Sequence, residues 1–270
     1  MKTIGFLIVA LICASVLFTN CKKDKDDFTY SSVTAVNAKV EGGSKYDFDK
    51  VLGVMYYGNY YDDELVVNEG NYTNGGFSFS LPDNVDAECL YRLLDGFSDF
   101  PGKLNVSDNF ALMNFIEIEA FTSGQYMGDF EYATYEFNQS TTGVSYSASM
   151  GMYCYVDRNV TVKGKGSETE TYEGITTTMK LVMDVAFKKG WNIMYMTIAG
   201  KETKTSASGT ITFTTKRPAG MKWYFEDDFG GGFFVAEVEQ RSTQEEEAAS
   251  KYFDEMQRLM MKHRPFKKSK

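Results

Sequence analysis

The chain has 270 residues, and its 28 basic residues against 37 acidic ones give a formal net charge of −9. This acidic balance argues against a nucleic-acid partner, because contacts to phosphate require a basic surface. Aromatic residues make up 15% of the chain, and the many Tyr, Phe, Thr and Val residues favour strands over helices, so we expect a mainly β protein.

The amino-terminal segment has the layout of a secretory signal. Lys2 supplies a positive start, and residues 4–18 are apolar apart from small residues and Cys13. This apolar run is shorter than the roughly 20 residues that a membrane-spanning helix needs. We therefore expect residues 1–20 to be a cleaved signal peptide and the mature chain to begin at Cys21.

The residues around the expected cleavage site resemble those of a lipoprotein. The segment 17–21, Leu-Phe-Thr-Asn-Cys, resembles a lipobox, and residues 22–27 form a Lys/Asp-rich run that is typical of a solvated spacer. This order of parts is similar to that in Bacteroidetes surface lipoproteins of unassigned function. The resemblance implies that Cys21 accepts lipid, that 21–27 form a charged tether, and that the protein lies on the outer membrane, exposed at the cell surface.

Residues 28–105 are expected to form a small antiparallel β unit. The last strand of this unit alternates Phe77, Phe79 and Leu81 behind an Asn-Gly turn, and it resembles the closing hairpin of Ig-like or transthyretin-like β-sandwich modules. Residues 84–96 have helical spacing and predict a short helix before a boundary near residue 105. Short apolar or alternating runs predict strands at 33–40, 51–57, 64–69 and 76–81.

Residues 106–240 are expected to form a meander of long antiparallel strands. The clearest strands are 144–156 and 175–187, where alternate positions are apolar, and Lys188-Lys189-Gly190 indicates a tight turn. A meander can avoid bare edges by curling, so a calycin-like barrel or half-barrel is the preferred architecture, with a two-sheet sandwich as the alternative. Strands and helices do not alternate along the sequence, so we do not expect a parallel sheet.

Residues 241–270 predict a carboxy-terminal amphipathic helix that ends in a basic tip. Ser242 and Thr243 precede three glutamates in a capping-box arrangement, and a single apolar stripe follows as far as Met260. We expect this helix to pack on the sheet, and binding to a partner or to a membrane surface is the alternative.

No set of residues predicts catalysis. The single histidine, His263, lies in the basic tail, where it cannot complete a triad or a zinc site. The acid pairs Glu117/Glu119 and Asp129/Glu131 have a spacing that glycosidases also use, but a solvated strand face explains them. We therefore expect no enzyme activity.

Cofactors and metals are not expected either. Residues 226–228 are acidic and precede three glycines, but they lack the ligand spacing of a calcium loop. Cys89 and Cys154 remain after Cys13 and Cys21 are assigned to the signal and the lipid, and we expect buried free thiols, with a disulfide as the alternative.

Four tyrosines flank a Gly-Asn turn and are the most unusual local feature: Tyr56, Tyr57, Tyr60 and Tyr61. Rings near a loop tip can stack on sugars or anchor a protein partner, whereas on adjoining strands they would pack into a core. The preferred hypothesis is a non-catalytic, lipid-anchored module that binds glycan or another envelope component there. The alternatives are a calycin-like carrier of a small apolar ligand and a structural component of the envelope.

Overall fold

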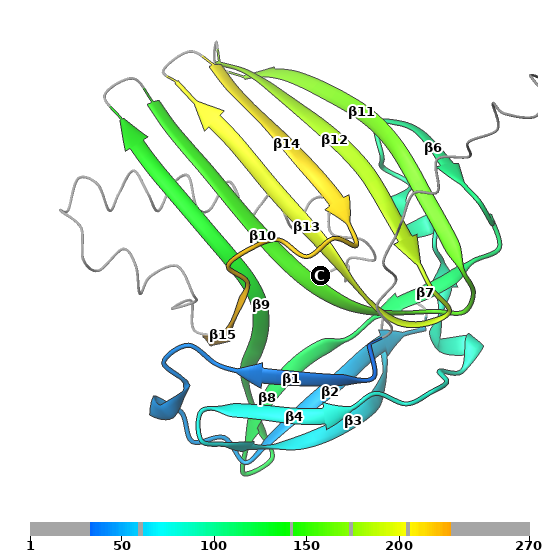
Figure 1. The fold of residues 1–270 in the computed structure, drawn as a ribbon, viewed down its shortest axis with the longest axis vertical. Coiled ribbons are helices and arrows are strands. Elements are labelled where there is room, and N and C mark those ends of the chain that lie inside the picture. The colour runs from blue at the N-terminus through cyan, green and yellow to red at the C-terminus, as the bar shows by residue number, and fades with distance from the viewer. Residues whose placement is uncertain (1–32, 59–61, 141–142, 173–174, 204–205, 228–270) are drawn as a thin grey trace, which may run out of the picture.

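The computed structural model describes a mainly β chain, as the composition predicts (Figure 1). Within the described part, fifteen strands are joined by hydrogen bonds into one mostly antiparallel sheet that does not close. The predicted fold class is therefore confirmed. The structure describes residues 33–58, 62–140, 143–172, 175–203 and 206–227.

Three predicted segments lie outside these ranges. They are the signal peptide at 1–20, the tether at 21–27 with Cys21, and the amphipathic helix at 241–270. Among the described residues, no helix combines the length and the apolar character that crossing a membrane requires.

The four short strands predicted in the first unit are present. Phe77 and Phe79 are buried, as their alternation predicts. The strands are β1 (Ala35–Lys39), β2 (Lys50–Tyr57), β3 (Asp63–Thr73) and β4 (Gly76–Ser80), with a 3-10 turn η1 (Gly43–Lys45) after β1. They pair in the order β1-β4-β3-β2, and β2 continues the sheet to β8 (Glu117–Thr122).

The short helix predicted over 84–96 is wrong. The segment instead contains two 3-10 turns, η3 (Ala87–Cys89) and η4 (Asp95–Phe97), and a two-residue strand, β5 (Tyr91–Arg92), between them. The physical reason is that its apolar side chains serve two separate cores: Cys89 packs in one and Phe97 in the other. A single helical stripe faces only one direction, so the chain extends between the two cores.

The long strands form the second part of the sheet (Figure 1). The strands predicted at 144–156 and 175–187 are confirmed. In spatial order the strands are β9 (Gln125–Ser140), β10 (Gly143–Val156), β13 (Gly190–Glu202), β14 (Ser206–Thr214), β12 (Ile175–Phe187), β11 (Val160–Tyr172) and β6 (Gly102–Val106). Two short strands complete the sheet: β7 (Leu112–Phe115) pairs with β10, and β15 (Lys222–Asp227) pairs with β9.

The order of the long strands departs from a simple meander at one place. β12 and β13 are joined by the predicted tight turn, but β14 lies between them, antiparallel to β13 and parallel to β12. Ile211 of β14 is buried opposite Ile198 of β13 and Leu181 of β12. The turn signal predicted which strands follow one another, but the burial of β14 decides which strands pair.

The turn between β12 and β13 is held by a side chain. The buried amide of Asn192 accepts a hydrogen bond from the Lys188 amide at 3.0 Å and donates to the carbonyls of Lys188 and Gly190 at 2.8 Å. These contacts satisfy backbone groups that a hairpin ladder would otherwise satisfy. The two strands can therefore diverge and admit β14.

Strand β9 belongs to both parts of the sheet (Figure 1). Residues 125–129 pair with β8, and residues 132–140 pair with β10. β15 pairs with residues 128–133 and so occupies one edge of β9 where the partner on the other edge changes from β8 to β10. β8 and β10 therefore lie one after the other along that other edge. They separate near Phe130 and leave a cavity of about 70 Å³ between them.

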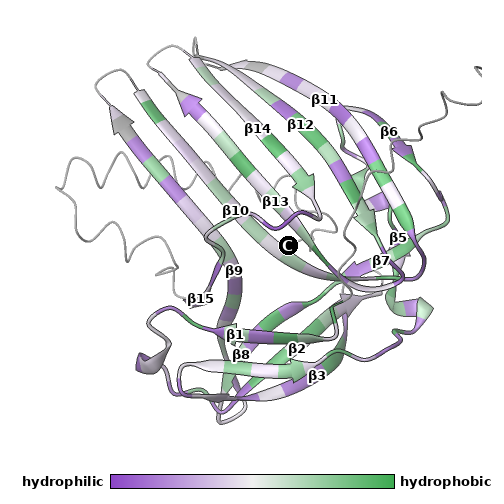
Figure 2. Ribbon diagram, viewed as in Figure 1, coloured by the Kyte–Doolittle hydropathy of each residue, from purple (hydrophilic) through white to green (hydrophobic). Residues whose placement is uncertain are grey.

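The sheet has one core on each face, and its apolar and polar residues alternate along the long strands (Figure 2). On β10, Met152 and Cys154 enter the methionine core, while Tyr153 and Tyr155 enter the aromatic core. The methionine core contains Met113, Met152, Met179, Met183, Met194 and Met196. The aromatic core contains Phe48, Tyr72, Phe77, Phe79, Phe130, Tyr132, Tyr153, Tyr155, Trp191, Tyr195 and Trp223.

Candidate functional site

The structure describes two of the four tyrosines predicted to bind a ligand. Tyr60 and Tyr61 lie outside the described residues, and Tyr56 and Tyr57 are half-buried at the end of β2. The Tyr56 hydroxyl donates a hydrogen bond of 2.6 Å to Oε1 of Glu119. Burial and this carboxylate raise the pKa of Tyr56, which keeps its phenol protonated as a donor.

Tyr56→Phe is expected to lower the free energy of unfolding by about 1–3 kcal/mol, because the change takes a hydrogen-bond donor away from the buried Glu119 carboxylate. Tyr57→Phe serves as the matched control, since the ring of Tyr57 packs against the aromatic core and its hydroxyl makes no hydrogen bond among the described residues. Urea unfolding of both variants measures the difference. Equal stability of the two variants would contradict the structural role of the Tyr56 hydroxyl.

The acid pairs do not all lie on a solvated face. Glu119 is only 5% exposed, so the expectation that solvent surrounds it is wrong. Strand pairing places Glu119 opposite Asp129, and Asp129 opposite Glu226 of β15. Within the ranges that the structure describes, no group of three or more Asp, Glu, His or Cys side chains is arranged to hold a metal ion.

The two cysteines among the described residues, Cys89 and Cys154, are free and buried, as predicted. Cys89 lies in the aromatic core and Cys154 in the methionine core, on opposite faces of the sheet. Burial raises the pKa of each thiol, so both remain protonated and unreactive at neutral pH.

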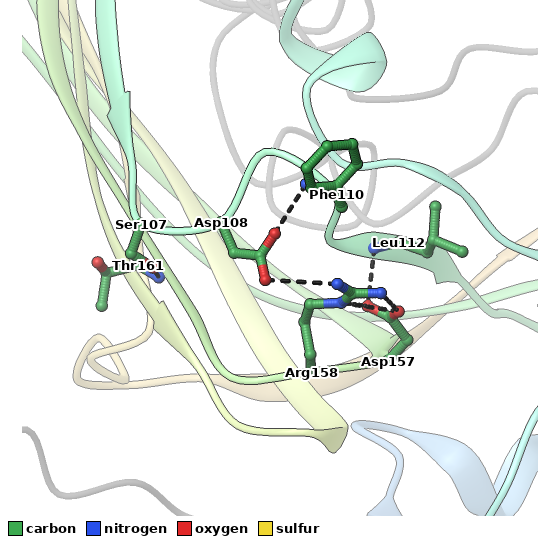
Figure 3. Close-up of polar contacts among 7 residues, drawn as sticks. All are labelled: Ser107, Asp108, Phe110, Leu112, Asp157, Arg158 and Thr161. Atoms are coloured by element: carbon green, nitrogen blue, oxygen red, sulfur yellow. Dashed lines mark hydrogen bonds and ion pairs between the residues drawn. The ribbon is translucent and has the colours of Figure 1, made fainter.

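A cluster of ionic contacts ties the loop between β6 and β7 to the turn between β10 and β11 (Figure 3). Arg158 donates to Asp157 at 2.7 Å and reaches Asp108 at 3.4 Å. Asp157 also accepts from the Leu112 amide at 2.8 Å, and Asp108 accepts from the Phe110 amide at 2.8 Å. Both carboxylates of this cluster accept hydrogen bonds from a backbone amide and from Arg158, so the cluster stabilises the fold.

Asp157→Asn is expected to lower the free energy of unfolding at pH 7 by about 1–2 kcal/mol. Burial opposes ionisation of Asp157, but the hydrogen bonds from Arg158 and Leu112 outweigh it and hold its pKa below the usual value. A carboxyl whose pKa is lower in the folded state stabilises the protein above about pH 4, and this contribution is lost as the pH falls further.

Unfolding measured from pH 7 to pH 3 tests this expectation. The variant should lose less stability than the wild type over the acidic part of the range. Asp184→Asn is the control, because that carboxylate is half exposed in its ion pair with Lys163 and should contribute little. Parallel pH profiles for wild type and Asp157→Asn would contradict the expectation.

A groove lies between β1 and the face of the long strands, and we call it the β1 groove. At one end the Val33 amide donates to the Trp191 carbonyl at 3.3 Å, and at the other the Glu41 amide donates to the Trp223 carbonyl at 2.8 Å. Between these contacts the groove is open, with a volume of about 590 Å³. Strand β1 is therefore hydrogen-bonded to the rest of the sheet just before its first residue and just after its last residue, and the groove lies between these two contacts (Figure 1).

Three tyrosines from three adjacent strands form the floor of the β1 groove. Gly151 of β10 lies opposite both Tyr132 of β9 and Tyr195 of β13. A Cβ atom on Gly151 would lie 2.8 Å from Cδ1 of Tyr132 and 3.1 Å from Cε1 of Tyr195. The absence of a side chain at residue 151 is what lets the two rings approach, and Tyr153 follows two residues later on the same face of β10.

An arginine and a tryptophan complete the β1 groove. The guanidinium carbon of Arg217 lies 5.5 Å from the centre of the Tyr132 ring, and the Arg217 charge opposes the rise that burial causes in the pKa of Tyr132. The Trp223 ring stacks on Tyr132 at 5.1 Å and on Tyr153 at 6.0 Å. The cation and the phenols thus gather at one place in the groove.

The electrostatics of the floor favour hydrogen-bond donors. Burial raises the pKa of Tyr195 to about 12 and also raises the pKa values of Tyr132 and Tyr153, although the Arg217 charge acts in the opposite direction. All three phenols are therefore protonated at neutral pH. The three tyrosines are 4–8% exposed and Trp223 stacks on two of their rings, so little ring face is open for a ligand to stack on.

A second, smaller groove of about 390 Å³ lies on the same face, further along the long strands. Ser145, Ser147, Ser208 and Thr210 contribute to its lining, beside Lys180 and other charged side chains. Its lining residues include no cluster of buried rings and none from a strand like β1 that crosses the sheet face, so the β1 groove is the stronger candidate.

No family model, curated protein or solved structure matches this chain. Its function is therefore inferred from the chemistry of its own residues. Sequence reasoning missed the β1 groove because its residues come from β1, β9, β10, β13 and β15, which are far apart in the chain. The one local signal was Gly151, since a glycine inside a strand often marks a close approach.

Proposed function

We propose that this chain is a lipid-anchored, non-enzymatic protein of the cell envelope that binds an envelope component in the β1 groove. The observation that carries the proposal is the convergence of Arg217 with the hydroxyl-bearing rings of Tyr132, Tyr153 and Tyr195 in an open groove. A cation beside protonated phenols suits polar or anionic ligands, because each group offers hydrogen bonds. Neither nucleic acid nor a cofactor is part of the proposal.

The anchor in this proposal is Cys21, and its support is the lipobox-like segment followed by the Lys/Asp-rich run at 22–27. One acyl chain gives only marginal membrane binding, whereas the several chains of a lipoprotein anchor hold a protein stably. The charged tether would keep the folded part clear of the outer membrane surface, where it can meet ligands.

Replacing Cys21 by alanine tests the anchor. The wild-type protein should incorporate labelled palmitate, partition into the detergent phase and be cleaved by protease added to intact cells. The variant should lose the label and remain in the aqueous phase. A variant that still partitions into detergent would contradict lipidation at this cysteine.

Titration of the full-length protein with purified envelope polysaccharides and envelope peptides tests ligand binding. Trp223 stacks within the groove floor, so its fluorescence in a Trp191→Phe background should change when the groove fills. Arg217→Ala should weaken the response. Lys216→Ala is the matched control, because Lys216 is an exposed neighbour outside the groove lining. Equal weakening by both variants would show that general charge, and not the groove, binds the ligand.

A further inference from the structure

Strand β1 presents a free backbone edge to the β1 groove. On its other edge, the Thr34 carbonyl accepts from the Leu81 amide at 2.8 Å, and the Val40 amide donates to the Gly75 carbonyl at 3.0 Å. Antiparallel pairs alternate between hydrogen-bonded and non-bonded residues, so the even-numbered residues of β1 bond to β4. The backbone groups of Ala35, Asn37 and Lys39 therefore point away from β4. On this side the described residues show one parallel bridge, between Val40 and Trp223, which occupies the Lys39 carbonyl, so the open part of the edge consists of the amides and carbonyls of Ala35 and Asn37 and the amide of Lys39.

The free edge and the groove coincide. Ala35, Asn37 and Lys39 line the same groove as Tyr153 and Tyr195. An edge strand with unpaired backbone groups is a template for another strand, and peptide-binding domains use such edges. A peptide that adds to β1 here would lie over the tyrosine hydroxyls.

The charge of the groove favours an acidic occupant. Its lining contains the three cations Lys39, Arg217 and Lys222 but the single acid Glu41, which is paired with Lys222 at 3.2 Å. The whole chain carries a formal net charge of −9, so this local excess of positive charge runs against the chain as a whole. Buried ring faces argue against sugar stacking as the main contact.

We propose that an extended, acidic segment of another envelope protein binds in the β1 groove as an added strand on β1, with one of its carboxylates on Arg217. This inference rests on the proposed function and names the class of ligand. Main-chain hydrogen bonds to Ala35, Asn37 and Lys39 supply affinity, and the Arg217 contact selects for an acidic side chain.

The test uses the full-length protein and a fluorescein-labelled (Val-Glu)3 peptide, with (Val-Lys)3 as the charge-reversed control. Fluorescence anisotropy should show at least tenfold tighter binding of the acidic peptide. Arg217→Ala should weaken its binding by about tenfold or more, as expected for a charge-assisted hydrogen bond, and Lys216→Ala should not. Ala35→Pro removes one free-edge amide and should weaken binding by about fivefold.

Hydrogen exchange on the wild-type protein gives a measurement that does not depend on the folding of the proline variant. The acidic peptide should slow exchange at the amides of Ala35, Asn37 and Lys39. Unchanged exchange at all three would overturn the added-strand geometry. Equal binding of the two peptides would overturn the charge selection.

A third ligand separates this inference from the proposed function. If an oligogalacturonate changes Trp223 fluorescence in an Arg217-dependent way while the peptide does not bind, the peptide inference fails and the proposed function stands. Concentration-dependent dimerisation that protects the same amides without peptide would also overturn it, by making a second copy the occupant. If peptide, oligogalacturonate and purified envelope components all leave the groove empty, the proposed function fails as well.

Discussion

Replacing Gly151 by valine is expected to abolish ligand binding in the β1 groove and to lower the free energy of unfolding by about 1–3 kcal/mol. The new Cβ would contact both Tyr132 and Tyr195 at distances shorter than normal packing allows. Both rings are held by neighbouring strands, so they can only tilt or separate. Either movement would displace the hydroxyls from Arg217 and change the groove floor.

Trp223 fluorescence and urea unfolding together measure the two effects of Gly151→Val. Ser147→Val is the control, because Ser147 lies on the same face of β10 and lines the smaller groove, not the β1 groove. It should change stability by roughly 0.5 kcal/mol or less and should leave groove binding intact. Full ligand affinity in Gly151→Val would contradict the role assigned to the tyrosine floor.

Phe187→Ala is expected to lower the free energy of unfolding by about 3–5 kcal/mol. Phe187 is fully buried at the end of β12, within the methionine core. Both tryptophans, Trp191 and Trp223, lie in the aromatic core on the other face of the sheet. Because β10 and β13 supply side chains to both cores, loss of the Phe187 ring should also shift the unfolding transition that the tryptophans report.

Comparison of two probes tests this coupling. Far-ultraviolet circular dichroism and tryptophan fluorescence should give the same denaturation midpoint, and both should move together in Phe187→Ala. Phe187→Leu should cost less, about 1.5 kcal/mol or below, because most of the volume is kept. A tryptophan transition that stays at the wild-type midpoint would show that the two cores unfold independently.

The sequence predicted those strands whose alternation is strict. Along β12, the positions from Met179 to Phe187 are buried at every second residue because one face meets the methionine core. The helix expected over 84–96 failed because local spacing cannot show that Cys89 and Phe97 face different cores. The predicted simple meander was wrong at β14 for a similar reason. The position of β14 depends on the burial of Ile211 and Phe213 between β12 and β13, which follow one another directly in the sequence.

The candidate site was largely hidden from the sequence. The Tyr56 to Tyr61 cluster was visible because its members are neighbours in the chain, whereas Tyr132, Tyr153 and Tyr195 meet only through strand pairing. Arg217 lies in a connecting segment, and no pattern around it indicates a site. Glu119 was expected in solvent because its strand alternates, but the hydroxyl of Tyr56 on β2 meets its buried carboxylate.

The position of β14 has a consequence for how the chain acquires its fold. Local contacts form before distant ones, so the tight turn after β12 favours an early hairpin of β12 with β13. That hairpin is absent from the native pairing and must open to admit residues 206–214. Folding should therefore pass through a trapped state, and a chain truncated before Ser206 should join β12 to β13 directly. The truncated chain would lack both β14 and β15 and would build a different sheet, so the last long strand to emerge during synthesis determines which of two sheets is made.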